Sequence, residues 1–235
     1  MTANEIVEQL RALGSDGYKK VLLNHGAKEP CFGVKIEELK KIQKRVKTDY
    51  QLALDLYATG IYDAMYLAGL VADDAAMTKK DLRKWLKGAK SPPIAEYTVA
   101  WVAAGSKHGH DLALEWIESD DEDEAATGWA TLCGLVSTKD DAELDLAELK
   151  RLLDRVQAMI HEEPNRVRYM MNSFVIALGC YVRDLTKLAL AAGKKIGPVT
   201  VDMGNTACKV PPASEYIQKV QKRGAIGKKR ATAKC

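Results

Sequence analysis

The chain has 235 residues, of which 47% are apolar and 29% are charged, and its formal net charge is +3. That apolar content is sufficient for a packed core, in one elongated domain or two small ones. No apolar run is long enough to span a bilayer, and the N-terminus lacks a basic stretch followed by an apolar block. We therefore expect a cytoplasmic protein with no membrane partner.

The cysteines and histidines predict neither a disulfide framework nor a metal centre. The five cysteines lie far apart, their number is odd and no two form a C-x-x-C pair, unlike the cysteines of disulfide-bonded folds and zinc sites. His108 and His110 flank Gly109 without a nearby cysteine or set of acids, which favours a turn over a metal site. The sequence indicates no metal and no cofactor.

Helical periodicity dominates the chain. Apolar residues recur three and four positions apart, and glycines or capping residues separate the runs. Residues 199–210 alone alternate like a strand, and a glycine interrupts them, so this segment is at most a β-hairpin arm or an irregular tail. In chain order, the pattern predicts helices at 4–13, 16–25, 36–46, 50–57, 62–71, 81–86, 94–104, 110–117, 125–136, 144–161, 165–182, 185–192 and 213–223.

About a dozen short helices joined by tight turns predict an all-α fold. Helix pairs of loosely similar length, each burying its face against its neighbours, are typical of an α-solenoid of antiparallel HEAT-like pairs. Such an array curves, and its concave side forms a groove suited to binding. We expect residues 1–196 to form this domain and residues 197–235 to form an irregular segment, a short helix and a basic tail.

The predicted helix at 94–104 is apolar nearly all round and follows Ser91-Pro92-Pro93, a typical helix start. Glu96 lies inside it, with Tyr97 beside it and Trp101 one turn beyond Tyr97. A carboxylate in such a helix must be paired, face a cleft or have a raised pKa. Glu96 is therefore either hydrogen-bonded to a neighbouring helix for structural reasons or a candidate site residue.

Positive charge is concentrated at the C-terminus. From residue 213 onward seven basic residues face one acid, so this part carries +6 and the preceding residues carry −3, which together give the net +3. A basic end on a nearly balanced body indicates an anionic partner such as nucleic acid, and a solvated, disordered tail is the alternative. The seven residues are Lys219, Lys222, Arg223, Lys228, Lys229, Arg230 and Lys234.

Three stretches have a recognisable pattern: residues 32–42 (Phe-Gly-Val-Lys-Ile-Glu-Glu-Leu-Lys-Lys-Ile), residues 62–68 (Tyr-Asp-Ala-Met-Tyr-Leu-Ala) and residues 112–120. With the order of the helices, they resemble the DNA alkylation repair family of HEAT-like repeat proteins, the AlkD-like group, over most of residues 27–195. The resemblance implies a C-shaped helical solenoid with a basic groove that holds duplex DNA. In active members it also implies removal of N3- or N7-alkylated purines without flipping the base.

In those active members a Trp, an Asp four residues later, an Arg on the next repeat and a second Trp flank the lesion, and the carboxylate stabilises positive charge on the sugar. Matching the central helix places Pro93 at the first Trp and Tyr97 at the Asp. Glu96 is one residue from the acid position, Trp101 one turn away, and Trp129 next to the Arg position. The resemblance thus implies either a rearranged catalytic set of these two tryptophans with Glu96 and Tyr97, or a site without catalysis.

Candidate DNA-binding residues lie at two places. Three of them open the helix that should carry the second Trp, along the implied groove, where cations can neutralise phosphates without sequence preference. Three more lie in the basic tail. The six residues are Arg166, Arg168, Asn172, Lys228, Lys229 and Arg230.

Three functions are compatible with these features. The first is a DNA-binding solenoid that holds duplex, damaged or branched DNA non-specifically, with glycosylase activity in doubt. The second is an active DNA glycosylase that excises N3- or N7-alkylated purines. The third is a protein-binding repeat scaffold, because HEAT-like grooves also hold peptides. We favour the first, with DNA as the partner and a monomeric protein.

Overall fold

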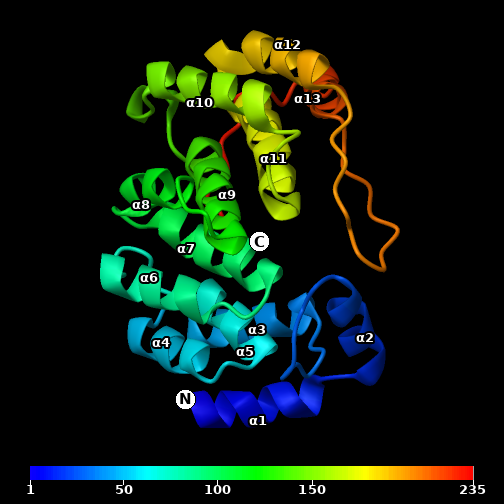
Figure 1. The fold of residues 1–235 in the computed structure, drawn as a ribbon. Helices are drawn as coiled ribbons and strands as arrows, with labels where there is room; N and C mark the ends of the chain where they lie inside the picture. The colour runs from blue at the N-terminus through cyan, green and yellow to red at the C-terminus, as the bar shows by residue number, and fades with distance from the viewer. Residues whose placement is uncertain (235) are drawn as a thin grey trace. The chain divides into compact units, whose positions relative to one another are not determined.

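The computed structural model describes residues 1–234, and every regular element in that span is a helix (Figure 1). The prediction of an all-α chain is therefore confirmed. The chain divides into two compact units. The first unit contains Met1–His108, Met203–Ala207 and Lys234, and the second contains Gly109–Asp202 and Cys208–Ala233. The predicted division after residue 196 stays a prediction.

Four helices of the first unit begin at a polar residue whose side chain caps them. Thr2 and Thr78 each form a capping box, and Ser15 and Asp49 each accept a hydrogen bond from a first-turn N–H group. These caps satisfy N–H groups that have no partner inside the helix. The elements are α1 (Ala3–Leu13), α2 (Asp16–Asn24), α3 (Ile36–Val46), α4 (Tyr50–Ala58), α5 (Tyr62–Val71), α6 (Lys79–Gly88), the π-helix η1 (Ile94–Val99) and α7 (Ala100–Gly105).

Helix α5 is the centre of the first unit, since all of its residues are buried. Its Asp63 carboxylate accepts hydrogen bonds from the backbone nitrogens of Phe32 (2.6 Å) and Val34 (2.7 Å), and so fixes the loop between α2 and α3. Gly69 allows η1 to pack closely, because a Cβ there would lie 2.7 Å from the Thr98 methyl carbon. Helix α5 therefore positions the segment that carries Glu96.

The predicted helix at 94–104 is formed, but its first part is a π-helix, and the α-helix begins only at Ala100. The sequence pattern predicted the helix but not this π-helical start. A π-turn closes its hydrogen bonds over five residues rather than four, which changes the direction in which successive side chains point. The side chains of Ile94–Val99 are therefore distributed around the axis differently from those of an α-helix.

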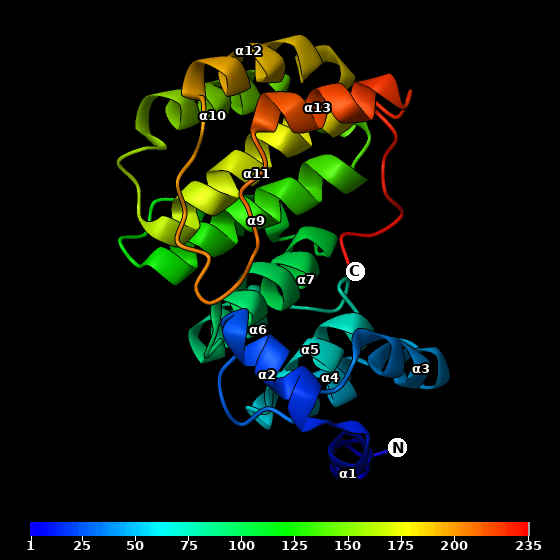
Figure 2. The same ribbon diagram turned by 90° about the vertical axis from the view of Figure 1, so that its right-hand side faces the viewer.

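The second unit is built on the packing of α9 against α11 (Figure 2). Trp129 of α9 and Phe174 of α11 are fully buried, with ring centroids 5.2 Å apart and ring planes at 61°. A Cβ at Gly128 would lie 2.9 Å from the Ala113 carbonyl oxygen of α8, so glycine permits the close approach of α8. The elements are α8 (Gly109–Trp116), α9 (Glu122–Thr138), η2 (Asp141–Glu143), α10 (Leu146–Met159), α11 (Asn165–Tyr181), η3 (Arg183–Leu185), α12 (Thr186–Ile196) and α13 (Ala213–Lys222).

Residues 199–210 form neither helix nor strand. Of the two predicted alternatives, a β-hairpin arm and an irregular segment, the structure contains the irregular segment. Two asparagines of α11 hold this irregular segment, through Asp202 within it and Pro211 directly after it. Asn165 donates to the Asp202 carbonyl (3.0 Å) and accepts from the Asp202 backbone nitrogen (2.7 Å). Asn172 donates to the Pro211 carbonyl (3.0 Å). Side-chain amides therefore supply the contacts that a strand partner would otherwise provide.

Candidate nucleic-acid interface

The π-helix of the first unit carries two predicted site residues and directs them differently. Glu96 is buried, with 2% of its surface exposed, whereas Tyr97 is 37% exposed. π-helices are rare and occur frequently at functional sites. Because of its burial, Glu96 can meet a nucleic acid only if the residues that cover it move. Its role as a catalytic acid stays a prediction.

Tyr97 and Trp101 form an aromatic pair at this site. Their ring centroids are 5.7 Å apart and their planes are inclined at 35°. Tyr66, which is buried, supports Trp101 edge-on, with centroids 5.4 Å apart and planes at 88°. A partly exposed aromatic ring that is backed by others can stack on a nucleic-acid base. The structure thus brings these two predicted residues together on the first unit.

Trp129 lies in the second unit and has no exposed surface. Its ring packs on Phe174, and the guanidinium carbon of Arg155 is 5.8 Å from its ring centroid. The indole is therefore a core residue here. The structure does not place it in the unit that holds Glu96, Tyr97 and Trp101, and its catalytic role stays a prediction.

The head of α11 presents Arg166 beside an acid. The guanidinium carbon of Arg166 lies 4.7 Å from the centroid of the Tyr169 ring. The backbone nitrogen of Arg166 donates to the Glu122 carboxylate (2.6 Å), which caps a helix whose own N-cap residue, Pro164, provides no side-chain cap. A carboxylate at this end suits the helix dipole. It also offsets part of the positive charge offered to a phosphate.

The other two predicted residues of α11 are more enclosed. Arg168 is partly exposed, but its Nε is buried and has no hydrogen-bond partner within residues 1–234. Asn172 is 2% exposed and donates to the Pro211 carbonyl. Arg168 can direct charge outward only through the end of its guanidinium. Asn172 anchors the irregular segment in this structure.

The basic tail is held against the second unit by hydrogen bonds, rather than being the solvated, disordered tail that was the alternative. The tail contributes only backbone atoms to these contacts, whereas the rest of the second unit contributes two backbone carbonyls and one arginine side chain. They run from the Gly227 nitrogen to the Cys180 carbonyl (2.8 Å), from Arg183 Nη2 to the Ile226 carbonyl (3.0 Å) and from the Arg230 nitrogen to the Ser137 carbonyl (2.8 Å).

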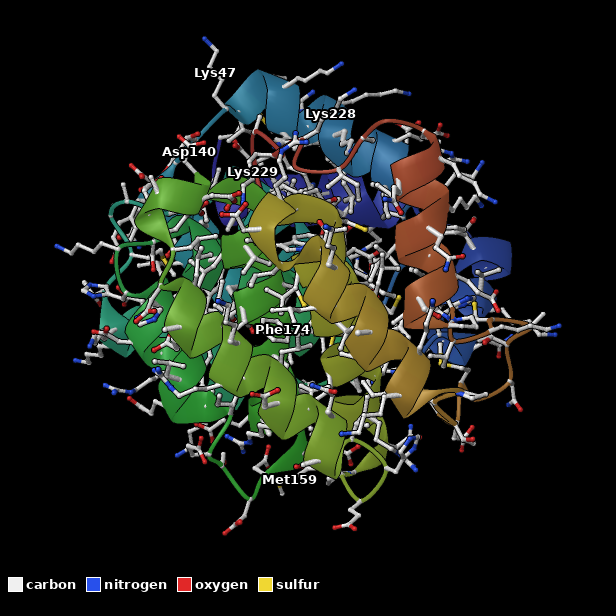
Figure 3. All side chains as sticks on the ribbon, turned by 90° about the horizontal axis from the view of Figure 1, so that it is seen from above. Lys47, Asp140, Met159, Phe174, Lys228 and Lys229 are labelled. Atoms are coloured by element: carbon white, nitrogen blue, oxygen red, sulfur yellow. The ribbon has the colours of Figure 1, made fainter. Side chains whose placement is uncertain are left out.

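Lys228 and Lys229, which are labelled in Figure 3, differ in exposure and in their contacts. The Lys229 side chain is 16% exposed, and its Nζ lies 2.7 Å from Asp141 Oδ1 and donates to the Val136 carbonyl (2.8 Å). Lys228 is exposed. Since its charge is already paired, Lys229 is a weaker candidate for phosphate binding than Lys228.

Lys234 is paired in the same way within the first unit. Its Nζ lies 2.7 Å from Asp74 Oδ1 and donates to the Ala72 carbonyl (2.8 Å). Burial raises the pKa of Asp74 to about 6, while the charge and hydrogen bond of Lys234 act in the opposite direction. Two basic residues of the tail are therefore used inside the protein.

The charge on the outward face of α13 was not included among the predicted site residues. Lys219, Lys222 and Arg223 are exposed there, whereas Ala213 and Ile217 are buried. The signal was present in the sequence, because two apolar residues four positions apart fix which side of this helix faces the core.

Within residues 1–234, no group of three or more His, Cys, Asp or Glu side chains is arranged to hold a metal ion. Among the helices of that span, none is both long and apolar enough to cross a membrane.

Comparison with known sequences identifies relatives along nearly the whole chain. A family model described as DNA alkylation repair enzyme matches residues 6–217. Uncharacterized protein Lmo0209 of Listeria monocytogenes is 34% identical over 229 residues, which cover 95% of this chain and 99% of the relative. Uncharacterized protein Lin0241 of Listeria innocua is 32% identical over the same length and coverage.

Comparison with solved structures gives the fold. A structure described as a new family of proteins related to the HEAT-like repeat DNA glycosylases, with affinity for branched DNA structures, aligns with a TM-score of 0.92. It is 36% identical in sequence, and the match covers 100% of both chains. The predicted HEAT-like repeat fold is confirmed. Together with the match over residues 6–217, these relatives establish that the chain belongs to the DNA alkylation repair enzyme family.

Proposed function

We propose that this protein binds branched DNA and holds its duplex arms through the phosphate backbone, without sequence preference. The observation that carries the proposal is the likeness to the solved structure described as having affinity for branched DNA, because it extends over 100% of both chains at 36% identity. The match therefore includes the whole backbone on which the surface residues of the two proteins are carried.

The exposed basic residues of the second unit support binding through phosphates. Arg166 at the head of α11 and Lys228 and Arg230 in the tail are at least partly exposed. Each cation that neutralises a phosphate releases counterions from the DNA, which gives affinity that falls with salt and carries no sequence information. The proposed partner is therefore recognised by its charge and its shape.

We further propose that base excision is not the principal activity. The burial of Glu96 and of Trp129 supports this, since a catalytic carboxylate must lie close to the sugar carbon whose bond breaks. One alternative is favoured by a specific observation, the π-helix that holds Glu96 next to the Tyr97–Trp101 pair. That alternative is an alkylpurine DNA glycosylase that uses these three residues.

Gel-shift titration of the full chain tests the binding proposal. The probes are a four-way junction and a linear duplex with the sequence of one pair of arms, each at low and at physiological salt. We expect the junction to shift at lower protein concentration, and both complexes to weaken as salt rises. Absence of any shift at low salt would contradict the proposal and favour a protein-binding scaffold.

Release of 7-methylguanine and 3-methyladenine from alkylated duplex DNA tests the alternative. We expect no release above the spontaneous rate. Release that Glu96→Gln abolishes, and that the matched change Glu37→Gln on the exposed surface of α3 leaves intact, would establish the glycosylase instead. Both variants must retain the wild-type circular dichroism spectrum.

A further inference from the structure

The outward face of α13 combines unpaired positive charge with an exposed aromatic ring. Within the described residues, no acid lies within ion-pair distance of Lys219, Lys222 or Arg223. These three residues line a shallow surface hollow of about 420 Å³ together with Glu215 and Gln218. Tyr216, on the same helix, is 45% exposed. A cationic face with an exposed aromatic residue suits a nucleic acid better than an apolar protein surface.

The packing of α13 fixes this orientation. Ile217 has no exposed surface and rests on Gly179 of α11, where a Cβ would lie 2.7 Å from Ile217 Cγ1. Ala213 is also buried, and a Cβ at Gly193 of α12 would lie 3.2 Å from its methyl carbon. Helical geometry then turns Tyr216, Lys219 and Arg223 away from this buried side.

The face is separate from the predicted basic residues at the head of α11. Helix α13 meets α11 at Gly179, thirteen positions after Arg166. At 1.5 Å per residue, this separation along α11 is about 20 Å. The two basic places are therefore distinct surfaces of the second unit, and neither can share one phosphate with the other.

Helix α13 carries three of the five exposed basic residues at the C-terminal end. Lys229 and Lys234 are paired with Asp141 and Asp74 at 2.7 Å. On α13, by contrast, three cations face one acid, Glu215, which leaves a charge of +2 on the outward side. The seven basic residues cannot be distinguished in the sequence. In the structure two of them form ion pairs within the protein and the other five are exposed.

We propose that the outward face of α13, formed by Tyr216, Lys219, Lys222 and Arg223, is a second DNA-contacting surface that holds an additional arm of a branched DNA through its phosphates. This inference rests on the proposed function. A branched DNA offers duplex arms that leave the branch point in different directions. A protein with two separate cationic surfaces can contact two such arms, whereas a linear duplex bound at one surface leaves the other unused.

The test compares salt dependences for the full chain and for a variant that combines Lys219→Gln, Lys222→Gln and Arg223→Gln. The measured quantity is the slope of log association constant against log salt, for a four-way junction and for a linear duplex, by fluorescence anisotropy. Each lost phosphate contact lowers the slope by about 0.9, so three contacts lower it by up to about 2.7. We expect this decrease for the junction and an unchanged slope for the duplex.

A matched control uses two exposed basic residues on α10 of the same unit, changed as Lys150→Gln with Arg151→Gln. It is compared with Lys219→Gln with Lys222→Gln, which removes the same charge from α13. The pair Lys219→Arg with Lys222→Arg keeps the charge and should keep the slope. Circular dichroism confirms that each variant is folded.

Three results would overturn the inference: an unchanged junction slope in the α13 variant, an equal loss for junction and duplex, or an equal loss from the α10 control. The failure of the proposed function looks different, because the wild-type chain itself would then bind no DNA. If the wild-type chain binds the junction and the α13 variant has the same slope, the role of α13 is refuted and the proposed function is not.

Discussion

Gly179 of α11 is the place where a single methyl group should disturb α13. A Cβ there would lie 2.7 Å from Ile217 Cγ1 and closer still to its Cδ1, whereas carbon atoms in contact prefer about 3.5–4.0 Å. Overpacking of this kind costs about 1–3 kcal/mol. Alanine also favours a helix over glycine by about 1 kcal/mol. We therefore expect Gly179→Ala to lower the free energy of unfolding by about 0–2 kcal/mol.

The second change, Ile217→Ala, removes all of the atoms with which the new methyl would clash. Alone it should cost about 2–5 kcal/mol, because Ile217 has no exposed surface and its truncation leaves a cavity. In that background the methyl of Gly179→Ala fills part of the space, so the change should stabilise the protein. The helix-propensity gain is common to both backgrounds and cancels, which leaves a coupling of about 1–3 kcal/mol.

Urea unfolding, followed by circular dichroism, provides the four free energies of this cycle. As a control, Gly128→Ala combined with Ile217→Ala should be additive, because the atoms nearest to a Cβ at residue 128 belong to Ile117 and Ala113 rather than to α13. Effects of Gly179→Ala and Ile217→Ala that add to within about 0.5 kcal/mol would refute the described seating of α13.

Three other predictions concern the anchors of the tail and of the irregular segment. Asn172→Ala should speed proteolysis within residues 197–212, because it removes the hydrogen bond to the Pro211 carbonyl; unchanged cleavage would show that the anchor is dispensable. Lys228→Gln should weaken DNA binding more than Lys229→Gln, whose charge is already paired; the reverse order in a gel shift would contradict the described ion pair. Since burial raises the pKa of Asp74 to about 6 from 3.8, the folded protein holds a proton between these values that the unfolded chain releases. Unfolding free energy should therefore rise as the pH falls through about 6 towards about 4, and Asp74→Asn should remove that part of the rise; identical pH profiles would refute it.

Much of the helical order was predictable, because the sequence carries local signals for where helices begin and end. Thr2, Ser15 and Asp49 cap their helices as polar residues before an apolar run should. The predicted bounds of α5, 62–71, are those found. Patterns of three and four residues also placed Tyr97 near Trp101, which lie within one turn of each other in either kind of helix.

The π-helix could not be predicted in the same way. Residues Ile94–Val99 are buried except for Tyr97, so the apolar pattern has no polar side from which the helical period could be read. The burial of Glu96 and of Trp129 has a related cause, since composition indicates an apolar environment but not its depth. These properties depend on packing between elements, and the periodicity of a single segment carries no information about that packing.

Contacts between distant parts of the chain were also outside the reach of local patterns. Asn172 and Pro211 are 39 positions apart, and Lys229 and Val136 are 93 apart. A basic tail and a polar residue at a helix head both suggest DNA contacts when they are considered alone. The structure assigns Asn172 and Lys229 to internal anchoring, because their partners come from other elements of the same unit.

Competition between two DNA shapes tests the central claim most directly. The full chain is bound to a labelled four-way junction at low salt, and the complex is challenged with unlabelled junction or with unlabelled linear duplex at equal phosphate concentration. The proposed function predicts displacement by the junction at the lower concentration. Equal displacement by the two competitors, or the failure of any junction complex to form, would contradict it.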